Sequence, residues 1–138
     1  MASQGLTMNE LACEVQIVEK AYAKINLTLE VIGKRSDGFH RLASVMQTIN
    51  LYDTVTFAPS DEIIISCDDD QISVENNLVS KTACLLKERL DVKNGANIFV
   101  RKSVPVAGGL GGGSADAAAT LRGLNTVSYT HLTLQTKA

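Results

Sequence analysis

The chain has 138 residues, which is enough for one domain with a modest core. Its formal net charge of -2 argues against nucleic acid or an anionic membrane as a partner, because both select basic surfaces. No apolar run approaches the roughly 20 residues of a membrane helix, and the N-terminus lacks the pattern of a secretory or organelle signal. We therefore expect a cytoplasmic protein.

The first half of the chain carries mostly β-strand patterns. Residues 22–31 alternate apolar and polar side chains, which predicts a strand with two different faces. Two glycines and a Ser-Asp pair predict a loop over residues 33–41. Three further short strands are expected at residues 44–51, 54–57 and 62–67.

The second half alternates helix and strand. Asn77 is a suitable N-cap for a helix over residues 78–90, whose leucines recur on one face. A strand is expected over residues 96–104, and Ser114 is expected to cap a second helix that ends near residue 124. Strands first, then helix, strand and helix, predict an α+β fold rather than a doubly wound sheet.

The three cysteines, Cys13, Cys67 and Cys84, are scattered and have no CxxC spacing. Neither a disulfide framework nor a zinc site is indicated, so we expect free thiols and no metal ligands among the side chains.

Residues 105–116, PVAGGLGGGSAD, contain five of the ten glycines and lead directly into an alanine-rich helix. Glycines let backbone N–H groups approach an anion closely, and a helix N-terminus adds favourable charge, so the pattern predicts a phosphate-binding loop. A flexible surface linker is the alternative, but the apolar flanking residues Val104 and Val106 disfavour it. A Walker A loop is excluded because Ser114 stands where its lysine is required, and the GxGxxG spacing also fails.

The segment from Pro105 to Ser114 resembles the ATP loop of the GHMP kinase superfamily. Residues 21–31, AYAKINLTLEV, are similar to a first-strand motif of that family, and residues 33–40, GKRSDGFH, are similar to a G-x-R-x-D-G-[YF]-H segment. These motifs resemble in particular the members that phosphorylate a hydroxyl of cytidine diphosphate methylerythritol in non-mevalonate isoprenoid synthesis. The resemblance covers about residues 15–125 and implies the ribosomal protein S5 domain 2-like fold of GHMP N-terminal domains.

The resemblance also implies roles for individual residues. Lys24 matches the catalytic lysine, which would stabilise charge on the substrate hydroxyl or on the transferring phosphoryl group. Asn26, Phe39 and His40 match residues that bind the small-molecule substrate, the last two at its cytidine. The triphosphate of ATP, with Mg²⁺ bridging its oxygens, would lie on the loop residues, which are Pro105, Val106, Ala107, Gly108, Gly109, Leu110, Gly111, Gly112, Gly113, Ser114 and Ala115.

Two departures from the family pattern limit the expected activity. The G-A-D-[VI]-P segment that holds the catalytic aspartate of the family is missing, and no carboxylate follows Asp116. We interpret Asp116 as structural, because we expect it in the first turn of the second helix, where a carboxylate is favourable to the helix dipole. Residues 126–138 do not resemble the family, and the C-terminal domain of the family is absent. We therefore expect an N-terminal ATP-binding domain over residues 1–125, family-like from about residue 15, followed by a truncated or chimeric tail. A genuine terminal strand is the alternative for this tail. Little or no turnover is expected, because a general base is typically worth about 10²–10⁴-fold.

Two other functions stay open from the sequence. The chain could be a different GHMP-type kinase with another alcohol substrate, or a non-catalytic nucleotide-binding domain. The segment 33–40 favours the cytidine substrate over a sugar or mevalonate. The sequence does not predict an oligomeric state.

Overall fold

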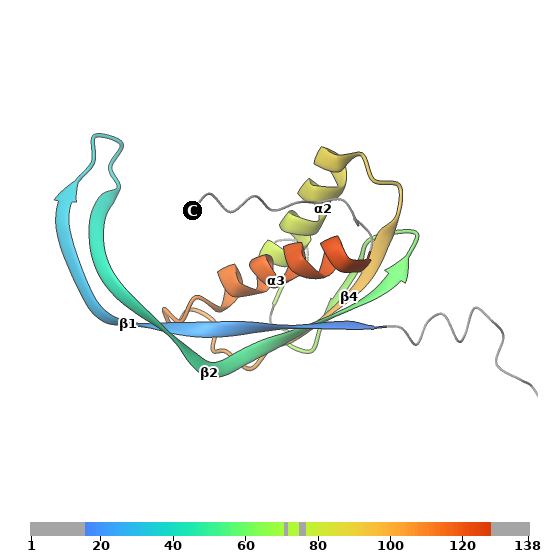
Figure 1. The fold of residues 1–138 in the computed structure, drawn as a ribbon, viewed down its shortest axis with the longest axis horizontal. Coiled ribbons are helices and arrows are strands. Elements are labelled where there is room, and N and C mark those ends of the chain that lie inside the picture. The colour runs from blue at the N-terminus through green and yellow to red at the C-terminus, as the bar shows by residue number, and fades with distance from the viewer. Residues whose placement is uncertain (1–15, 71, 75–76, 128–138) are drawn as a thin grey trace, which may run out of the picture.

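The computed structural model describes residues 16–70, 72–74 and 77–127, which form one sheet with two helices on one of its faces (Figure 1). This arrangement confirms the predicted α+β class. The elements in chain order are β1 (Ile17–Lys34), β2 (His40–Ser60), β3 (Ile64–Cys67), α2 (Leu78–Leu90), β4 (Gly95–Arg101) and α3 (Gly112–Val127).

The sheet is mixed, with the spatial order β1-β2-β4-β3. β1 pairs with β2 and β2 pairs with β4 in antiparallel directions, whereas β3 and β4 run parallel. The parallel pair requires a crossover, and α2 lies within it. β4 therefore joins the local hairpin of β1 and β2 to the edge strand β3.

The helix expected over residues 78–90 is confirmed at both ends. Asn77 is extended, and its side-chain oxygen accepts a hydrogen bond from the backbone N–H of Val79 at 2.9 Å, as an N-cap should. Asp91 ends the helix in the left-handed conformation, with φ of 49°. Both signals are local to the chain, which is why the sequence pattern located this element.

The expectation of two separate strands at residues 44–51 and 54–57 is wrong, because both belong to the 21-residue strand β2. Asp53 resembles a strand boundary in the sequence, but it pairs with Ala21 of β1 and is fully buried. Its carboxylate accepts hydrogen bonds from the backbone N–H groups of Ser103 and Val104. The backbone N–H groups of these two residues therefore bond to a side chain instead of to a neighbouring strand. β4 ends at Arg101 instead of residue 104.

The second helix also differs from its prediction. α3 begins at Gly112, so Ser114 is its third residue and not its N-cap, and the helix continues to Val127. Thr126 and Val127, assigned to the tail from the sequence, are the last residues of this helix. The rest of the expected tail, residues 128–138, lies outside the described residues.

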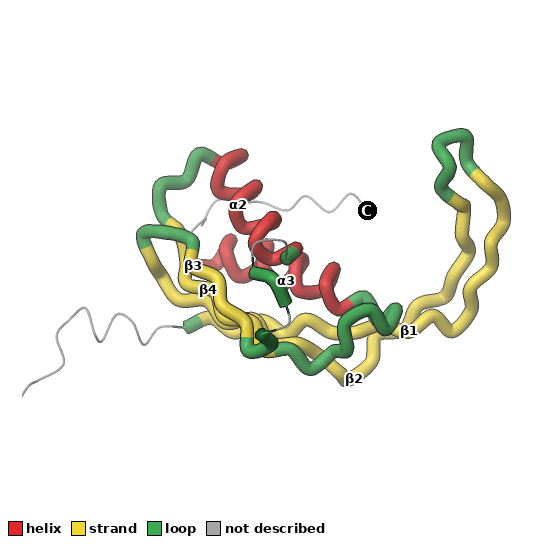
Figure 2. The backbone as a smooth tube through the Cα atoms, turned by 180° about the vertical axis from the view of Figure 1, so that it is seen from behind, coloured by secondary structure: helices red, strands yellow, loops and turns green. Residues whose placement is uncertain are grey.

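The distal part of the β1–β2 hairpin forms a two-stranded arm, defined here as residues 26–46, which curves away from the helices (Figures 1 and 2). Many large apolar side chains of the arm are more than half exposed. They are Leu27, Leu29, Val31, Ile32, Phe39, Leu42, Val45 and Met46. The packed core therefore belongs to the other half of the hairpin, which carries the helices.

The core lies between the sheet and the two helices. Val55 and Phe57 of β2 and Ile98 of β4 are fully buried and meet the helices on one sheet face. α3 approaches most closely at Gly123, where an added Cβ would overlap the ring of Phe57. This glycine is required by contact and not by backbone conformation.

We expect Gly123→Ala to destabilise the fold by about 1–3 kcal/mol, because the new methyl group overpacks against Phe57. Alanine normally stabilises a helix relative to glycine by about 1 kcal/mol. A loss of stability in Gly123→Ala would therefore point to packing, because helix propensity alone predicts a gain. Urea unfolding followed by circular dichroism measures the effect. Ala118→Gly at an exposed position of the same helix reports propensity alone, and a Gly123→Ala protein as stable as the parent would contradict the packing argument.

Candidate functional site

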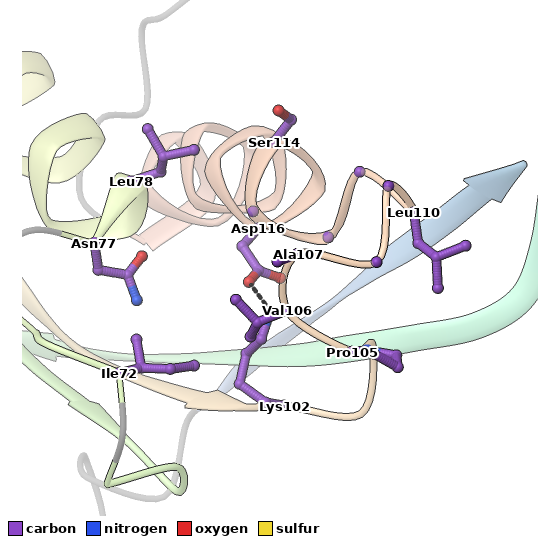
Figure 3. A pocket seen from close by; sticks show the side chains of 15 residues that line it. Ile72, Asn77, Leu78, Lys102, Pro105, Val106, Ala107, Leu110, Ser114 and Asp116 are labelled. Carbon is purple, nitrogen blue, oxygen red and sulfur yellow. Dashed lines mark hydrogen bonds and ion pairs between the residues drawn. The ribbon is translucent and has the colours of Figure 1, made fainter.

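The glycine-rich loop forms a wall of a pocket of about 390 Å³. All of residues 105–114 line it, and Ile72, Asn77 and Leu78 lie across from the loop (Figure 3). Lys102 and Asp116 lie between these two sides. Ala115 is half-buried and packs against the core, so it supports the loop without lining the pocket.

The loop backbone has the shape expected of an anion cradle. Gly109 and Gly111 have φ of 70° and 71°, in the left-handed region that glycine adopts without strain. Ala107 also has a positive φ, of 61°, which is uncommon for a residue with a side chain. A Cβ at Gly113 would lie 3.4 Å from the Leu78 side chain across the pocket, so glycine leaves that space open. The first N–H groups of α3 are at this position, where a helix has no internal acceptors for them.

Lys24 contacts the loop directly. The β1–β2 register shifts between Tyr22 and Lys24, and at this shift the Lys24 backbone N–H donates to the Leu110 carbonyl at 2.9 Å. The Lys24 ammonium donates to the Gly109 carbonyl, also at 2.9 Å. A Cβ on Gly111 would lie 3.2 Å from Lys24 Cε, so the loop and the lysine are in close contact. A lysine and a glycine loop separated by 85 residues are thus brought to one place.

The three residues expected to bind the substrate lie on the hairpin arm. Asn26 lies at its base, close in sequence to Lys24, and its Oδ1 accepts a hydrogen bond from the Ser44 hydroxyl at 3.1 Å. Phe39 and His40 lie at the tip, where Phe39 is 71% exposed and His40 pairs with Lys34. The tip lies away from the helices in both views, so the structure brings Lys24 to the loop and leaves Phe39 and His40 apart from it (Figures 1 and 2).

A buried charge cluster beside the loop was missed in the sequence. It consists of Asp53 of β2, Lys102 after β4 and Asp116 of α3. The Lys102 ammonium donates to Asp53 Oδ2 at 2.5 Å and to Asp116 Oδ2 at 2.8 Å. Asp53 and Asp116 are almost fully buried, and the Lys102 side chain is 10% exposed. Asp116 lies within an alanine-rich run, which is a sequence signal that a buried partner of opposite charge was needed. Asp53 lies between a tyrosine and a threonine and carries no such signal.

The cluster contains one cation and two carboxylates, so the three pKa values do not move alike. Burial would raise the pKa of Asp53, but hydrogen bonds from Lys102 and two backbone N–H groups outweigh it, and the pKa is lowered. Burial would likewise lower the pKa of Lys102, but its bonds to both carboxylates raise it. Burial raises the pKa of Asp116 to about 6, helped by Asp53 and opposed by Lys102. Asp116 is therefore the member that takes up a proton in mild acid.

The expectation that Asp116 acts on the helix dipole from the first turn is wrong. It is the fifth residue of α3, and the first turn contains no acidic residue. Its Oδ1 is buried without a hydrogen-bond partner, and its Oδ2 accepts from Lys102. The side chain of Asp116 contacts another part of the chain through Lys102, and its structural role stays a prediction.

Three observations concern the classes of site considered from the sequence. Within residues 16–70, 72–74 and 77–127, no group of three or more His, Cys, Asp or Glu side chains is placed to hold a metal ion. Neither helix in these ranges has the length and apolarity to cross a membrane. Cys67 and Cys84 are free thiols, whereas Cys13 lies outside the described residues.

The chain is similar to enzymes named 4-diphosphocytidyl-2-C-methyl-D-erythritol kinase. The enzyme of Prochlorococcus marinus (strain MIT 9215) is 50% identical over 121 residues, which are 86% of this chain and 39% of the relative. That of Caldicellulosiruptor saccharolyticus is 47% identical over 112 residues, which are 79% of this chain and 39% of the relative. The chain thus spans about two fifths of the length of these curated relatives.

Solved structures agree with the sequence matches. A crystal structure of 4-(cytidine 5'-diphospho)-2C-methyl-D-erythritol kinase, at 30% identity, superposes with a TM-score of 0.74 over 86% of this chain and 43% of that one. A homoserine kinase from Cytophaga hutchinsonii, 20% identical with a TM-score of 0.55 over 91% of this chain and 37% of that one, shares the fold. The family described as GHMP kinases N terminal domain matches residues 77–138. The chain therefore resembles the N-terminal part of 4-diphosphocytidyl-2-C-methyl-D-erythritol kinase and has the ribosomal protein S5 domain 2-like fold of GHMP kinase N-terminal domains.

Proposed function

We propose that this chain is the ATP-binding part of a kinase that transfers the γ-phosphoryl group to the 2-hydroxyl of 4-diphosphocytidyl-2-C-methyl-D-erythritol. The observation that carries the proposal is the contact between the Lys24 ammonium and the Gly109 carbonyl, which joins a cation to an open glycine loop at a helix N-terminus. The relatives' names supply the substrate.

The pocket has two walls that suit the two ends of a nucleotide. The backbone of residues 107–113 offers N–H groups and the dipole of α3 to a phosphate chain. On the opposite side, Ile72 and Leu78 are apolar and Asn77 is polar, a combination that suits a nucleoside base. The volume of about 390 Å³ lies within the usual range for small-molecule sites.

Lys24 would act on charge that develops during transfer. Its ammonium is held at the rim of the loop by a backbone carbonyl, which is a weaker partner than a carboxylate. It can therefore exchange that contact for a phosphoryl oxygen or for the substrate alkoxide, and stabilise negative charge there. Asn26, at the base of the arm and two residues from Lys24, would orient the acceptor alcohol.

The site fits a metal ion that is bound through the nucleotide. Asp116 is the acidic side chain that lines the pocket among the described residues, and Lys102 already occupies its Oδ2. The glycine loop would hold Mg²⁺ through the bound nucleotide, and the ion would supply partial neutralisation of the phosphate charge. The chain's own contribution is the open loop, into which a Cβ at Gly113 would project toward Leu78.

The same bond to Lys102 makes Asp116 a poor general base. We propose that the base is not among the described residues, and that this chain by itself binds ATP but transfers phosphate slowly. The expected cytoplasmic location also stays a prediction.

Gly108→Asp tests the phosphate cradle. A Cβ at Gly108 meets its neighbours no closer than 3.6 Å, so the substitution fits the loop but adds a negative charge beside the phosphates. We expect ATP affinity to fall about tenfold, which is about 1.4 kcal/mol, and the loss to shrink at high salt. Isothermal titration calorimetry measures it, with Gly108→Asn as the uncharged control of the same shape. Equal affinities of the two variants would mean that no anion binds at this loop.

Lys24→Met tests the cation at the rim. Loss of the ammonium should weaken binding of ATP and of inorganic triphosphate by roughly tenfold in the same titration, because both ligands place negative charge near it. Lys20→Met is the matched control, since Lys20 lies earlier on β1 with its ammonium 4.8 Å from the centre of the Tyr52 ring. A Lys24→Met protein that binds both ligands as well as Lys20→Met does would exclude a role for Lys24 at the phosphates.

Steady-state ATP consumption tests the proposed lack of a base. With purified chain, Mg²⁺ and the cytidine diphosphate methylerythritol substrate, we expect a rate at least about 10²-fold below the 1–100 s⁻¹ typical of kinases. Turnover within that range, abolished by Lys24→Met, would show that the chain contains a sufficient catalytic set.

A further inference from the structure

The buried charge cluster of Asp53, Lys102 and Asp116 ties together both ends of the glycine loop. Where the chain enters the loop, the backbone N–H groups of Ser103 and Val104 donate to Asp53 Oδ1 at 2.6 and 2.8 Å. The Lys102 ammonium joins the other oxygen of Asp53 to Asp116 on α3, the helix that follows the loop. The two stems of the loop are residues 102–104 before it and the start of α3 after it. One carboxylate of β2 thus fixes the distance between these two stems.

Stability alone is a weak explanation for this cluster. Removing two carboxylates and an ammonium from water costs several kcal/mol per ion, and well-packed apolar side chains of similar volume often serve a fold as well. The cluster also carries one uncompensated carboxylate, and the raised pKa of Asp116 records that cost. The bonds of the cluster do, however, fix geometry, because its members come from β2, from the segment after β4 and from α3.

The buried charge cluster lies directly under the glycine loop. A Cβ at Gly112 would lie 3.0 Å from Val104 Cγ1 and 3.6 Å from Asp53 Oδ2, so the first residue of α3 packs on the cluster itself. Lys102 and Asp116 also line the pocket, and the bond between them lies between its two walls (Figure 3). A change in the spacing of the stems would therefore move the N–H groups at the start of α3.

We propose that Lys102 is a positioning residue for triphosphate binding: by joining Asp53 to Asp116, it holds the two stems of the glycine loop at the separation that a phosphate chain requires. This inference rests on the proposed function. Lys102 acts here through its side chain on the loop and makes no bond to the ligand.

The test compares nucleotide affinity with fold stability in the full 138-residue chain. Lys102→Met removes the ammonium. The second variant, Lys102→Met/Asp116→Ala, also removes the carboxylate that is left without a partner, so this protein carries no unpaired buried charge at residue 116. Titration with ATP and with inorganic triphosphate should show at least a tenfold loss for both ligands, corrected for the folded fraction from circular dichroism. Equal losses for the two ligands locate the defect at the phosphates.

Two further variants separate positioning from stability. Ile98→Val, in the buried core of β4 and away from the loop, lowers stability and should leave both affinities unchanged. Lys93→Met, at an exposed position between α2 and β4, removes a cation that does not line the pocket, and it should retain both affinities within threefold of the parent. Parent-like affinity of Lys102→Met or of the double variant overturns the inference, as does an equal loss in Lys93→Met. If the parent itself binds neither ligand, the proposed function fails as well, and that outcome is distinct from the others.

Discussion

The contact between β1 and the glycine loop is the constraint on which the site depends. A shift in the β1–β2 register just before Lys24 lets its backbone N–H bond to Leu110, and its ammonium then reaches Gly109. A second register shift, between Asn26 and Thr28, lies at the start of the arm. Two neighbouring irregularities in one strand thus lie at the rim of the pocket and at the start of the arm.

Elements with local signals could be predicted from the sequence. The N-cap at Asn77 and the leucine spacing located α2 at its correct bounds, and the concentration of glycines located the loop. The contact of Lys24 with that loop could not come from spacing, because the two are far apart in the chain. It was expected only because the family motifs occur together, and the roles of Asn26, Phe39 and His40 stay predictions on the same basis.

Elements that depend on distant partners could not be predicted in this way. Asp53 resembled a strand boundary in the sequence, because nothing near it shows that Ser103 and Val104 donate to its carboxylate. Lys102 lay inside the strand expected over residues 96–104, and nothing near it shows that two buried carboxylates accept from its ammonium. The start of α3 was placed three residues late because serine is a common N-cap, whereas here Gly112 and Gly113 begin the helix. In each case a tertiary contact outweighed the local preference.

The strand order has a consequence for how the chain reaches this fold. β1 and β2 are neighbours in sequence and can pair early. The other edge of β2 and the strand β3 have no partner strand until β4 is made, and β4 follows α2 in the chain. During synthesis an extended hairpin with an open edge therefore precedes the strand that covers it. Open edges recruit strands of other molecules, so nascent chains at this stage are the form most exposed to intermolecular association.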